Sequence, residues 1–155
     1  MAKRGLFGAA AIAVLACALH GAAQQPDRGF WRAASNTASS ITGDIGISNT
    51  KLTIGFKGFV LMPVRSLKPV EVASVFDSDV NSAGTGALYR VNISEEQRFL
   101  RKNTLCGTES TQWMATYVIG KTLNVAFFSG ETEPVFTFDA ISHSPNLCGT
   151  FVYAR

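Results

Sequence analysis

The chain has 155 residues, of which 46% are hydrophobic and 16% are charged, and its formal net charge is +3. Lys3 and Arg4 lie in an N-terminal segment that we expect to be removed, and without them 12 basic residues face 11 acidic ones. A balance of +1 argues against a nucleic-acid partner, because such binding depends on clustered cations that face phosphates.

The first 23 residues have the three-part layout of a secretory signal peptide. Two cations precede an uncharged apolar run over residues 5–19, and Gly21 and Ala23 are the small residues wanted before a cleavage site. The apolar run is shorter than the roughly 20 residues that cross a bilayer, so the sequence predicts no transmembrane span. We expect cleavage after Ala23 and an exported protein, either periplasmic or secreted.

A second processing route is open. Residues 14–17, Val-Leu-Ala-Cys, are similar to a bacterial lipobox, in which Cys17 would be lipidated. Residues 18–40 would then form a tether, and the protein would be lipid-anchored in the envelope.

Two cysteines remain after either route, because cleavage discards Cys17 and lipidation consumes it. Cys106 and Cys148 each lie in the tetrapeptide Leu-Cys-Gly-Thr. An even pair in an oxidising compartment predicts a structural disulfide. The pair does not have the C-x-x-C spacing of a redox motif, and further Cys or His ligands for zinc are not present.

The remaining chain reads as one β-rich domain. Residues 24–40 are polar and predict a flexible lead-in, and residues 41–155 predict a single domain. Period-two alternation predicts antiparallel strands over 45–47 and 51–57, joined by a turn at 48–50. This pattern places Phe56 on the same face as Leu52 and Ile54, and the apolar run 59–64 predicts a third strand.

The periodicity then changes to that of a helix in two places. Pro69 suits the first helical position and predicts a short helix over 69–76. After a strand at 89–93, Ser94 begins a capping-box pattern that predicts a helix over 95–102. The basic and acidic residues of this second helix are expected to form a solvated surface.

The last third is rich in strands. Alternation predicts strands at 113–119, 123–127, 136–140 and 151–153, with a tight turn at residues 120–121. The whole pattern predicts a mainly β (α+β) fold: a curved antiparallel sheet or small barrel of about seven to eight strands, with two short helices and one disulfide.

One acidic run is a candidate calcium site. Asp77, Asp79 and Asn81 place oxygen side chains at alternate positions, as at the start of an EF-hand loop. The later EF-hand positions are not matched, because Ser82 and Leu88 stand where Gly and Glu are required. Asx residues also form polar turns without any metal, so both interpretations remain open.

Catalytic residues are not marked by any motif. His143 lies in a polar loop, and a Ser-His-acid site is defined by geometry rather than spacing, but no nucleophile motif accompanies it. The sequence therefore assigns no catalytic residue and no cofactor.

Aromatic residues offer two interpretations. On strand faces they most often form the core of a small sheet, but in a barrel they can also line a cavity for an apolar ligand. The candidate lining residues are Trp31, Trp113, Tyr117, Phe136 and Phe138.

Two resemblances accompany these patterns. Residues 29–31, Gly-Phe-Trp, are similar to the G-x-W motif of lipocalin-like (calycin) barrels, which implies a Trp that closes one end of a ligand-holding barrel under a basic side chain. The segments 35–38 and 41–45, together with 103–107 and 111–117, resemble a family of small exported bacterial proteins. That resemblance implies a compartment and no activity.

These observations favour a non-enzymatic binding module of the envelope, acting on a protein or a small apolar ligand. A small periplasmic hydrolase that uses acids on the sheet or His143 is the alternative, as is a structural envelope lipoprotein anchored through Cys17. The sequence leaves the oligomeric state open.

Overall fold

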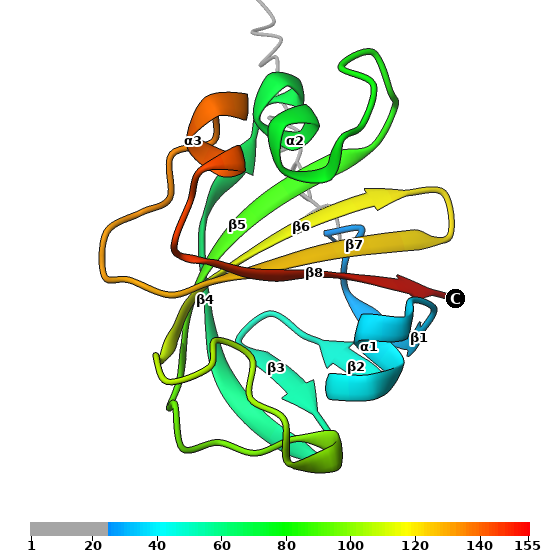
Figure 1. Cartoon of the computed structure of the whole chain (residues 1–155). Coiled ribbons are helices and arrows are strands. Elements are labelled where there is room, and N and C mark those ends of the chain that lie inside the picture. The colour runs from blue at the N-terminus through cyan, green and yellow to red at the C-terminus, as the bar shows by residue number, and fades with distance from the viewer. Residues whose placement is uncertain (1–24) are drawn as a thin grey trace, which may run out of the picture.

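Eight antiparallel strands close into a barrel in the computed structural model, which describes residues 25–155 (Figure 1). Each strand pairs with the next strand along the chain, and the last strand pairs with the first. The elements in chain order are β1 (Gly29–Ala33), α1 (Asn36–Ile41), β2 (Ile45–Ile47), β3 (Lys51–Ile54), β4 (Lys57–Leu67), α2 (Pro69–Phe76), β5 (Thr85–Ile93), the 3₁₀ helix η1 (Leu100–Lys102), β6 (Thr111–Ile119), β7 (Thr122–Phe128), α3 (Phe138–Ser142) and β8 (Leu147–Ala154).

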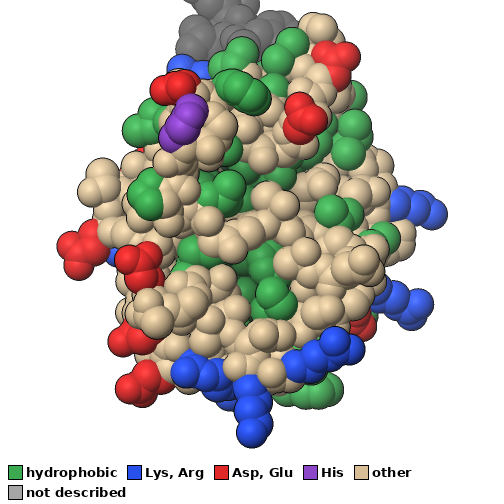
Figure 2. All heavy atoms as spheres, in the orientation of Figure 1, with side chains coloured by type: hydrophobic (Ala, Val, Ile, Leu, Met, Phe, Trp, Pro, Cys, Tyr) green, Lys and Arg blue, Asp and Glu red, His purple; other side chains and the backbone are tan. Residues whose placement is uncertain are grey.

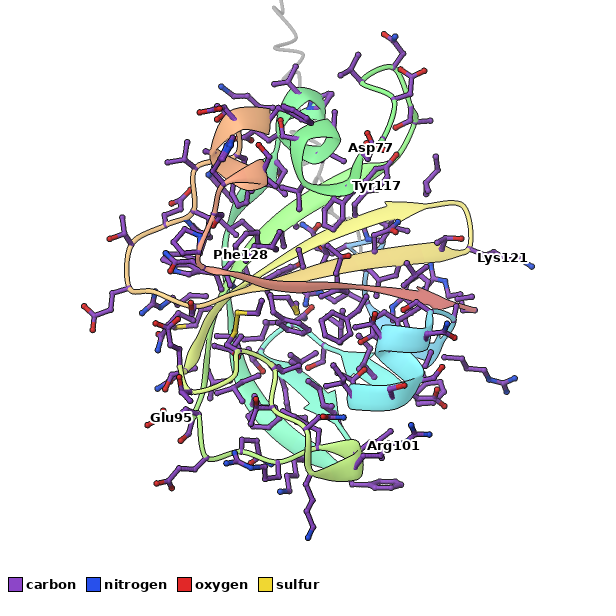
Figure 3. All side chains as sticks on the ribbon, in the orientation of Figure 1. Asp77, Glu95, Arg101, Tyr117, Lys121 and Phe128 are labelled. Carbon is purple, nitrogen blue, oxygen red and sulfur yellow. A yellow bond between two sulfur atoms is a disulfide. The ribbon has the colours of Figure 1, made fainter. Side chains whose placement is uncertain are left out.

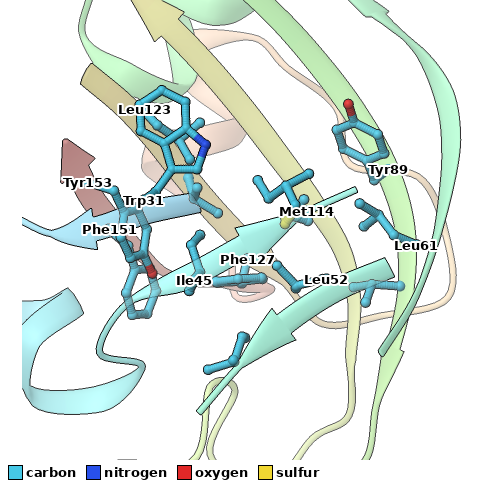
Figure 4. Close-up of a cluster of buried hydrophobic side chains, with 14 of the residues drawn as sticks. Trp31, Ile45, Leu52, Leu61, Tyr89, Met114, Leu123, Phe127, Phe151 and Tyr153 are labelled. Atoms are coloured by element: carbon cyan, nitrogen blue, oxygen red, sulfur yellow. The ribbon is translucent and has the colours of Figure 1, made fainter. Parts of the chain in front are cut away.

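The barrel interior is filled by apolar side chains from all eight strands. Successive residues of a strand point to opposite faces, so alternate positions meet inside the barrel. Figure 4 shows this cluster, whose labelled members are each at most 1% exposed. They are Trp31, Ile45, Leu52, Leu61, Tyr89, Met114, Leu123, Phe127, Phe151 and Tyr153. The interior is therefore a packed core.

A second apolar layer covers the outer face of β5, β6 and β7. Trp113, Tyr117 and Phe128 point outward and are buried under α2 and the segment that leads into α3. The Phe128 and Phe136 rings meet edge to face with centroids 5.8 Å apart. A Cβ atom at Gly86 would lie 2.5 Å from the Val72 side chain, so the glycine lets α2 approach the sheet closely.

Both ends of the barrel are covered. At one end residues 25–28, which we call the stopper, lie against Trp31 and Arg155. At the other end the segment between β5 and β6 carries Leu105 into the barrel core. A disulfide ties this segment to β8, joining Cys106 to Cys148 across 42 positions with a Cα–Cα distance of 4.8 Å.

The structure confirms the predicted fold class. The barrel is closed and mainly β, the predicted disulfide pair is joined, and α2 has the predicted bounds. The strand at 45–47 and the turn at residues 120–121 also stand as predicted. The export signal and Cys17 lie outside the described residues. No helix in the described part of the chain is long and apolar enough to cross a bilayer.

Four local predictions are wrong. The strand predicted over 51–57 ends at Ile54, and Gly55 and Phe56 form a turn before β4. The helix predicted over 95–102 is reduced to η1, because Arg101 and Lys102 adopt positive φ angles that an α-helix does not allow. The strand predicted over 136–140 is replaced by α3, which Thr137 begins by accepting a hydrogen bond from the Ala140 N–H. In the lead-in predicted over 24–40, residues 29–33 form β1 and residues 36–41 form α1.

Candidate functional site

The acidic run after α2 forms a polar turn. Asp79 Oδ1 accepts hydrogen bonds from the backbone N–H of Asn81 at 2.8 Å and from its side-chain amide at 3.2 Å. Asp77 ends α2 with a left-handed backbone, φ 50°. Among residues 25–155 no three His, Cys, Asp or Glu residues are grouped to hold a metal ion. The contacts of Asp79 and Asn81 are thus those of an Asx turn, and Asp77 is the C-cap residue of α2.

The five aromatic candidates are not brought together around one cavity. Trp31 lies inside the barrel, whereas Trp113, Tyr117 and Phe136 belong to the layer outside β5–β7. Phe138 begins α3 and is 75% exposed. The sequence could not separate these positions, because alternation along a strand does not say which of its faces is inside.

One feature implied by the G-x-W resemblance is present, but a ligand cavity beneath it is not. The guanidinium of Arg155 lies over the Trp31 ring. Beneath this pair the barrel is occupied by the packed side chains described above. The described geometry gives no room for an apolar ligand there.

His143 does not form a triad arrangement. It ends α3 on the surface, with its side chain 79% exposed. Its Nδ1 atom faces both Ser142 Oγ at 3.3 Å and Asp139 Oδ1 at 3.5 Å. In a catalytic triad the nucleophile and the acid lie on opposite ring nitrogens, so this local contact does not activate the serine.

A buried carboxylate anchors the stopper. Asp27 is 2% exposed, and its Oδ2 accepts hydrogen bonds from Tyr89 Oη at 2.7 Å and Thr116 Oγ1 at 2.8 Å. Burial of the Tyr89 hydroxyl raises its pKa above the ordinary value, and the hydrogen bond to Asp27 raises it further. Arg28 is also buried, with its Nε atom 3.9 Å from Asp27 Oδ1. This polar cluster fixes residues 25–28 across the end of the barrel.

The outer face of β4 carries an apolar stripe without a cover of its own. Val60, Met62 and Val64 are 68%, 53% and 43% exposed, and we call them the β4 stripe. Lys51 lies opposite Val60 on β3, and Arg90 lies opposite Met62 on β5. Isolated exposed apolar residues are ordinary, but three in a row on one strand form a patch.

Phe56 occupies the tip of the β3–β4 hairpin. Ile54 pairs with Lys57, so Gly55 and Phe56 form a two-residue turn in which both φ angles are positive, 54° and 68°. Such turns favour Asn, Asp and Gly, and the left-handed region costs a residue with a Cβ atom about 1–2 kcal/mol. The Phe56 side chain is nevertheless fully exposed, at 104% of the reference value. Packing therefore does not explain this residue.

Basic side chains surround that hairpin. A hollow of about 220 Å³ lies between it and the segment before η1, lined by Lys57, Arg98 and Leu100 among others. Arg101 and Lys102 follow with φ angles of 53° and 62°. Figure 2 shows Lys and Arg side chains gathered at the lower end of the molecule, where Figure 1 places the β3–β4 hairpin.

The sequence analysis did not predict the exposed Phe56 or the backbone conformation of the basic residues beside it. Alternation placed Phe56 among the inward residues of a longer strand, although Gly55 and Gly58 on either side of it are a turn signal. The cations of 98–102 were expected on a solvated helix, but the chain turns there with left-handed residues instead.

A comparison with protein-family models, with curated proteins and with solved structures finds no match to this chain, so no relative supplies a function for it.

Proposed function

We propose that the protein is a non-enzymatic binding module of the bacterial envelope that recognises a partner protein through the β4 stripe. The observation that carries this proposal is the contrast between two outer faces of one barrel. Over β5–β7 the outward aromatics are buried under α2 and the segment before α3, whereas on β4 the outward Val60, Met62 and Val64 remain exposed. Exposed contiguous apolar patches of this kind mark interaction sites.

The surroundings of the stripe fit a protein surface that is apolar at its centre and acidic at its edge. Lys51 flanks the stripe on β3, and its aliphatic chain lies against Gly58. A Cβ atom added at Gly58 would be only 2.8 Å from the Lys51 Cδ atom. Arg90 flanks it on β5 with its guanidinium 4.5 Å from the centre of the Trp113 ring. An apolar centre with a charged rim is typical of protein interfaces.

Two features favour a protein over a small apolar ligand. The barrel interior is occupied by its own side chains, so a buried ligand has no described space. The stripe lies along the outside of a strand, where an extended partner surface can make contact. The signal-like residues 1–23 support an exported location, either soluble or anchored through Cys17.

Site-specific photo-crosslinking tests the proposal. A photoreactive phenylalanine analogue at Met62 is expected to give an adduct of defined mass in the envelope fraction, and Val60→Lys in the same chain is expected to abolish it. The matched control carries the analogue at Ile119, which is 41% exposed at the end of β6 and is separated from β4 by β5. Equal adducts from both positions, or an adduct that survives Val60→Lys, would overturn the proposal, as would an adduct that contains only a second copy of this chain.

A further inference from the structure

A second surface of the molecule combines exposed apolar side chains with cations. It lies at the barrel end formed by the β3–β4 hairpin and η1, and we call it the basic tip. It consists of Phe56, Lys57, Arg98, Leu100, Arg101 and Lys102, all of them exposed. Phe56 and Leu100 supply its apolar part, and Leu100 is 44% exposed.

The cations of the basic tip are not neutralised within the described chain. None of Lys57, Arg98, Arg101 and Lys102 takes part in the ion pairs formed among residues 25–155. Two acids are close in sequence: Glu95 accepts a hydrogen bond from Ser110, and Glu96 is exposed and takes part in none of the ion pairs among the described residues. Figure 3 shows Glu95 and Arg101 on different sides of the lower end. The tip therefore presents four positive charges around a protruding aromatic ring.

Backbone strain is concentrated at the same place. Positive φ angles at residues other than glycine occur at Phe56, Arg101 and Lys102, and elsewhere in the described chain only at Asp77. Such strain persists where the surrounding structure holds it, and it clusters at functional sites. Here it turns one phenylalanine and two cations outward at one end of the barrel.

We propose that the basic tip docks on the surface of a membrane that contains anionic phospholipids. The charges match the headgroups, and each Lys or Arg near such a surface strengthens binding by about fivefold. Phe56 enters the interface between headgroups and acyl chains, where aromatic rings are favoured. Four exposed cations on long side chains around a fully exposed ring suit a fluid layer of headgroups better than the fixed pocket of a protein.

Binding to vesicles tests this proposal with the full exported chain. The protein is expected to float with vesicles of phosphatidylcholine that contain 40% phosphatidylglycerol, and not with phosphatidylcholine alone. The double variant Arg101→Glu, Lys102→Glu is expected to weaken binding at least 20-fold. Lys121→Glu is the matched charge control, because Lys121 lies in the β6–β7 turn at the opposite end of the barrel and is expected to leave binding within about twofold of the wild type.

The apolar contact has its own readout. Phe56→Trp places a fluorophore at the tip, and its emission is expected to shift to the blue and to be quenched by brominated lipid only with anionic vesicles. Phe56→Ser is expected to weaken flotation about tenfold, whereas Val135→Ser, an exposed control outside the tip, leaves it unchanged. Thermal melting verifies that each variant is folded.

Three results would overturn the proposal. The first is equal flotation with both kinds of vesicle, and the second is no flotation with either. The third is flotation that the Phe56 and Arg101–Lys102 variants leave intact. The tip variants can also be combined with the photoreactive analogue at Met62. If they lose the photo-adduct but still float with anionic vesicles, the tip is a protein-binding surface and lipid docking is overturned. Because the β4 stripe is tested separately, failure at one surface does not decide the other.

Discussion

The guanidinium carbon of Arg155 lies 4.3 Å from the centre of the Trp31 indole ring. The same guanidinium donates hydrogen bonds to the carbonyl oxygens of Arg28 at 3.0 Å and Pro26 at 3.3 Å. One side chain that follows β8 therefore holds both β1, through Trp31, and the stopper. Because β1 and β8 are the strands that close the barrel, this relationship secures the closure.

Removal of that side chain should destabilise the fold. Arg155→Ala is expected to lower the free energy of unfolding by about 1–2 kcal/mol, since it removes a cation–π contact and two charge-assisted hydrogen bonds. Arg155→Lys is expected to recover only part of the loss, because an ammonium group lacks the planar fork that reaches two carbonyls. Urea unfolding measures both, with Lys121→Ala as the control. An Arg155→Ala chain as stable as the wild type would contradict this account.

Asp27 is expected to matter through the hydroxyls that it satisfies. Asp27→Ala leaves the buried Tyr89 and Thr116 hydroxyls without their acceptor, which predicts a loss of about 2–4 kcal/mol in unfolding free energy. Tyr89→Phe in the Asp27→Ala background should cost much less than Tyr89→Phe alone. A double-mutant cycle measures this coupling. Additive effects of the two substitutions would show that the hydrogen bond is not formed.

The ion pair between Arg65 and Glu71 makes stability depend on pH. Two hydrogen bonds join them, at 2.9 Å and 3.0 Å, and Glu71 also accepts the Lys68 N–H at 2.8 Å. The hydrogen bonds from Arg65, and to a lesser extent the bond from Lys68, hold the pKa of Glu71 below its ordinary value of 4.5. The folded state thus binds the Glu71 proton less tightly than the unfolded state does. The contribution of Glu71 is present above pH 4.5 and is lost as pH falls through the lowered pKa.

Glu71→Gln tests this linkage. The variant should lose about 1 kcal/mol of stability at pH 7 and less at pH 3, because the contribution of the lowered Glu71 pKa declines as the pH falls below 4.5. Urea unfolding at the two pH values measures the difference. Glu96→Gln, at an exposed position without an ion pair among the described residues, is the control. An equal loss at both pH values would mean that packing, and not charge, is responsible.

The disulfide is expected to supply a large share of the stability. In the chain-entropy model a loop closed over 42 positions is stabilised by about 4 kcal/mol. Reduction of the wild-type chain should lower the urea midpoint accordingly. The double variant Cys106→Ala, Cys148→Ala should match the reduced protein and show no further response to reductant. A midpoint that reduction leaves unchanged would contradict this prediction.

Phe56 is expected to lower the stability of the fold while strengthening binding to anionic vesicles. Phe56→Asn should raise the free energy of unfolding by about 0.5–1 kcal/mol, because Asn tolerates the left-handed turn and removes an exposed ring from water. The same variant should bind anionic vesicles less tightly than the wild type. Thermal melting and vesicle flotation on one preparation measure both effects. A destabilised Phe56→Asn chain would show that the ring contributes to folding.

Much of the fold could be predicted from local patterns. Alternation marked most of the strands, and Pro69 and Glu71 marked α2, because each signal lies within a few residues of the element that it begins. The predictions failed where tertiary contacts override such signals. Ser94 and Gln97 formed a capping-box pattern, but residues 95–99 do not continue as a helix, and Leu105 is drawn into the barrel core instead. The candidate site was predicted less well than the fold, since Phe56 was expected to face inward.

By itself the sequence determined the mainly β fold, the position of α2 and the cysteine pair that closes a loop between distant segments. Only the tertiary structure decided which apolar residues are covered. Phe128 is buried because Phe136, from a separate segment, packs on it, whereas Met62 and Phe56 meet no such cover in the described chain. The physical reason is the distance along the sequence over which each effect acts. Alternation within a few residues shows which side chains share a face of a strand, whereas burial of that face depends on segments many positions away.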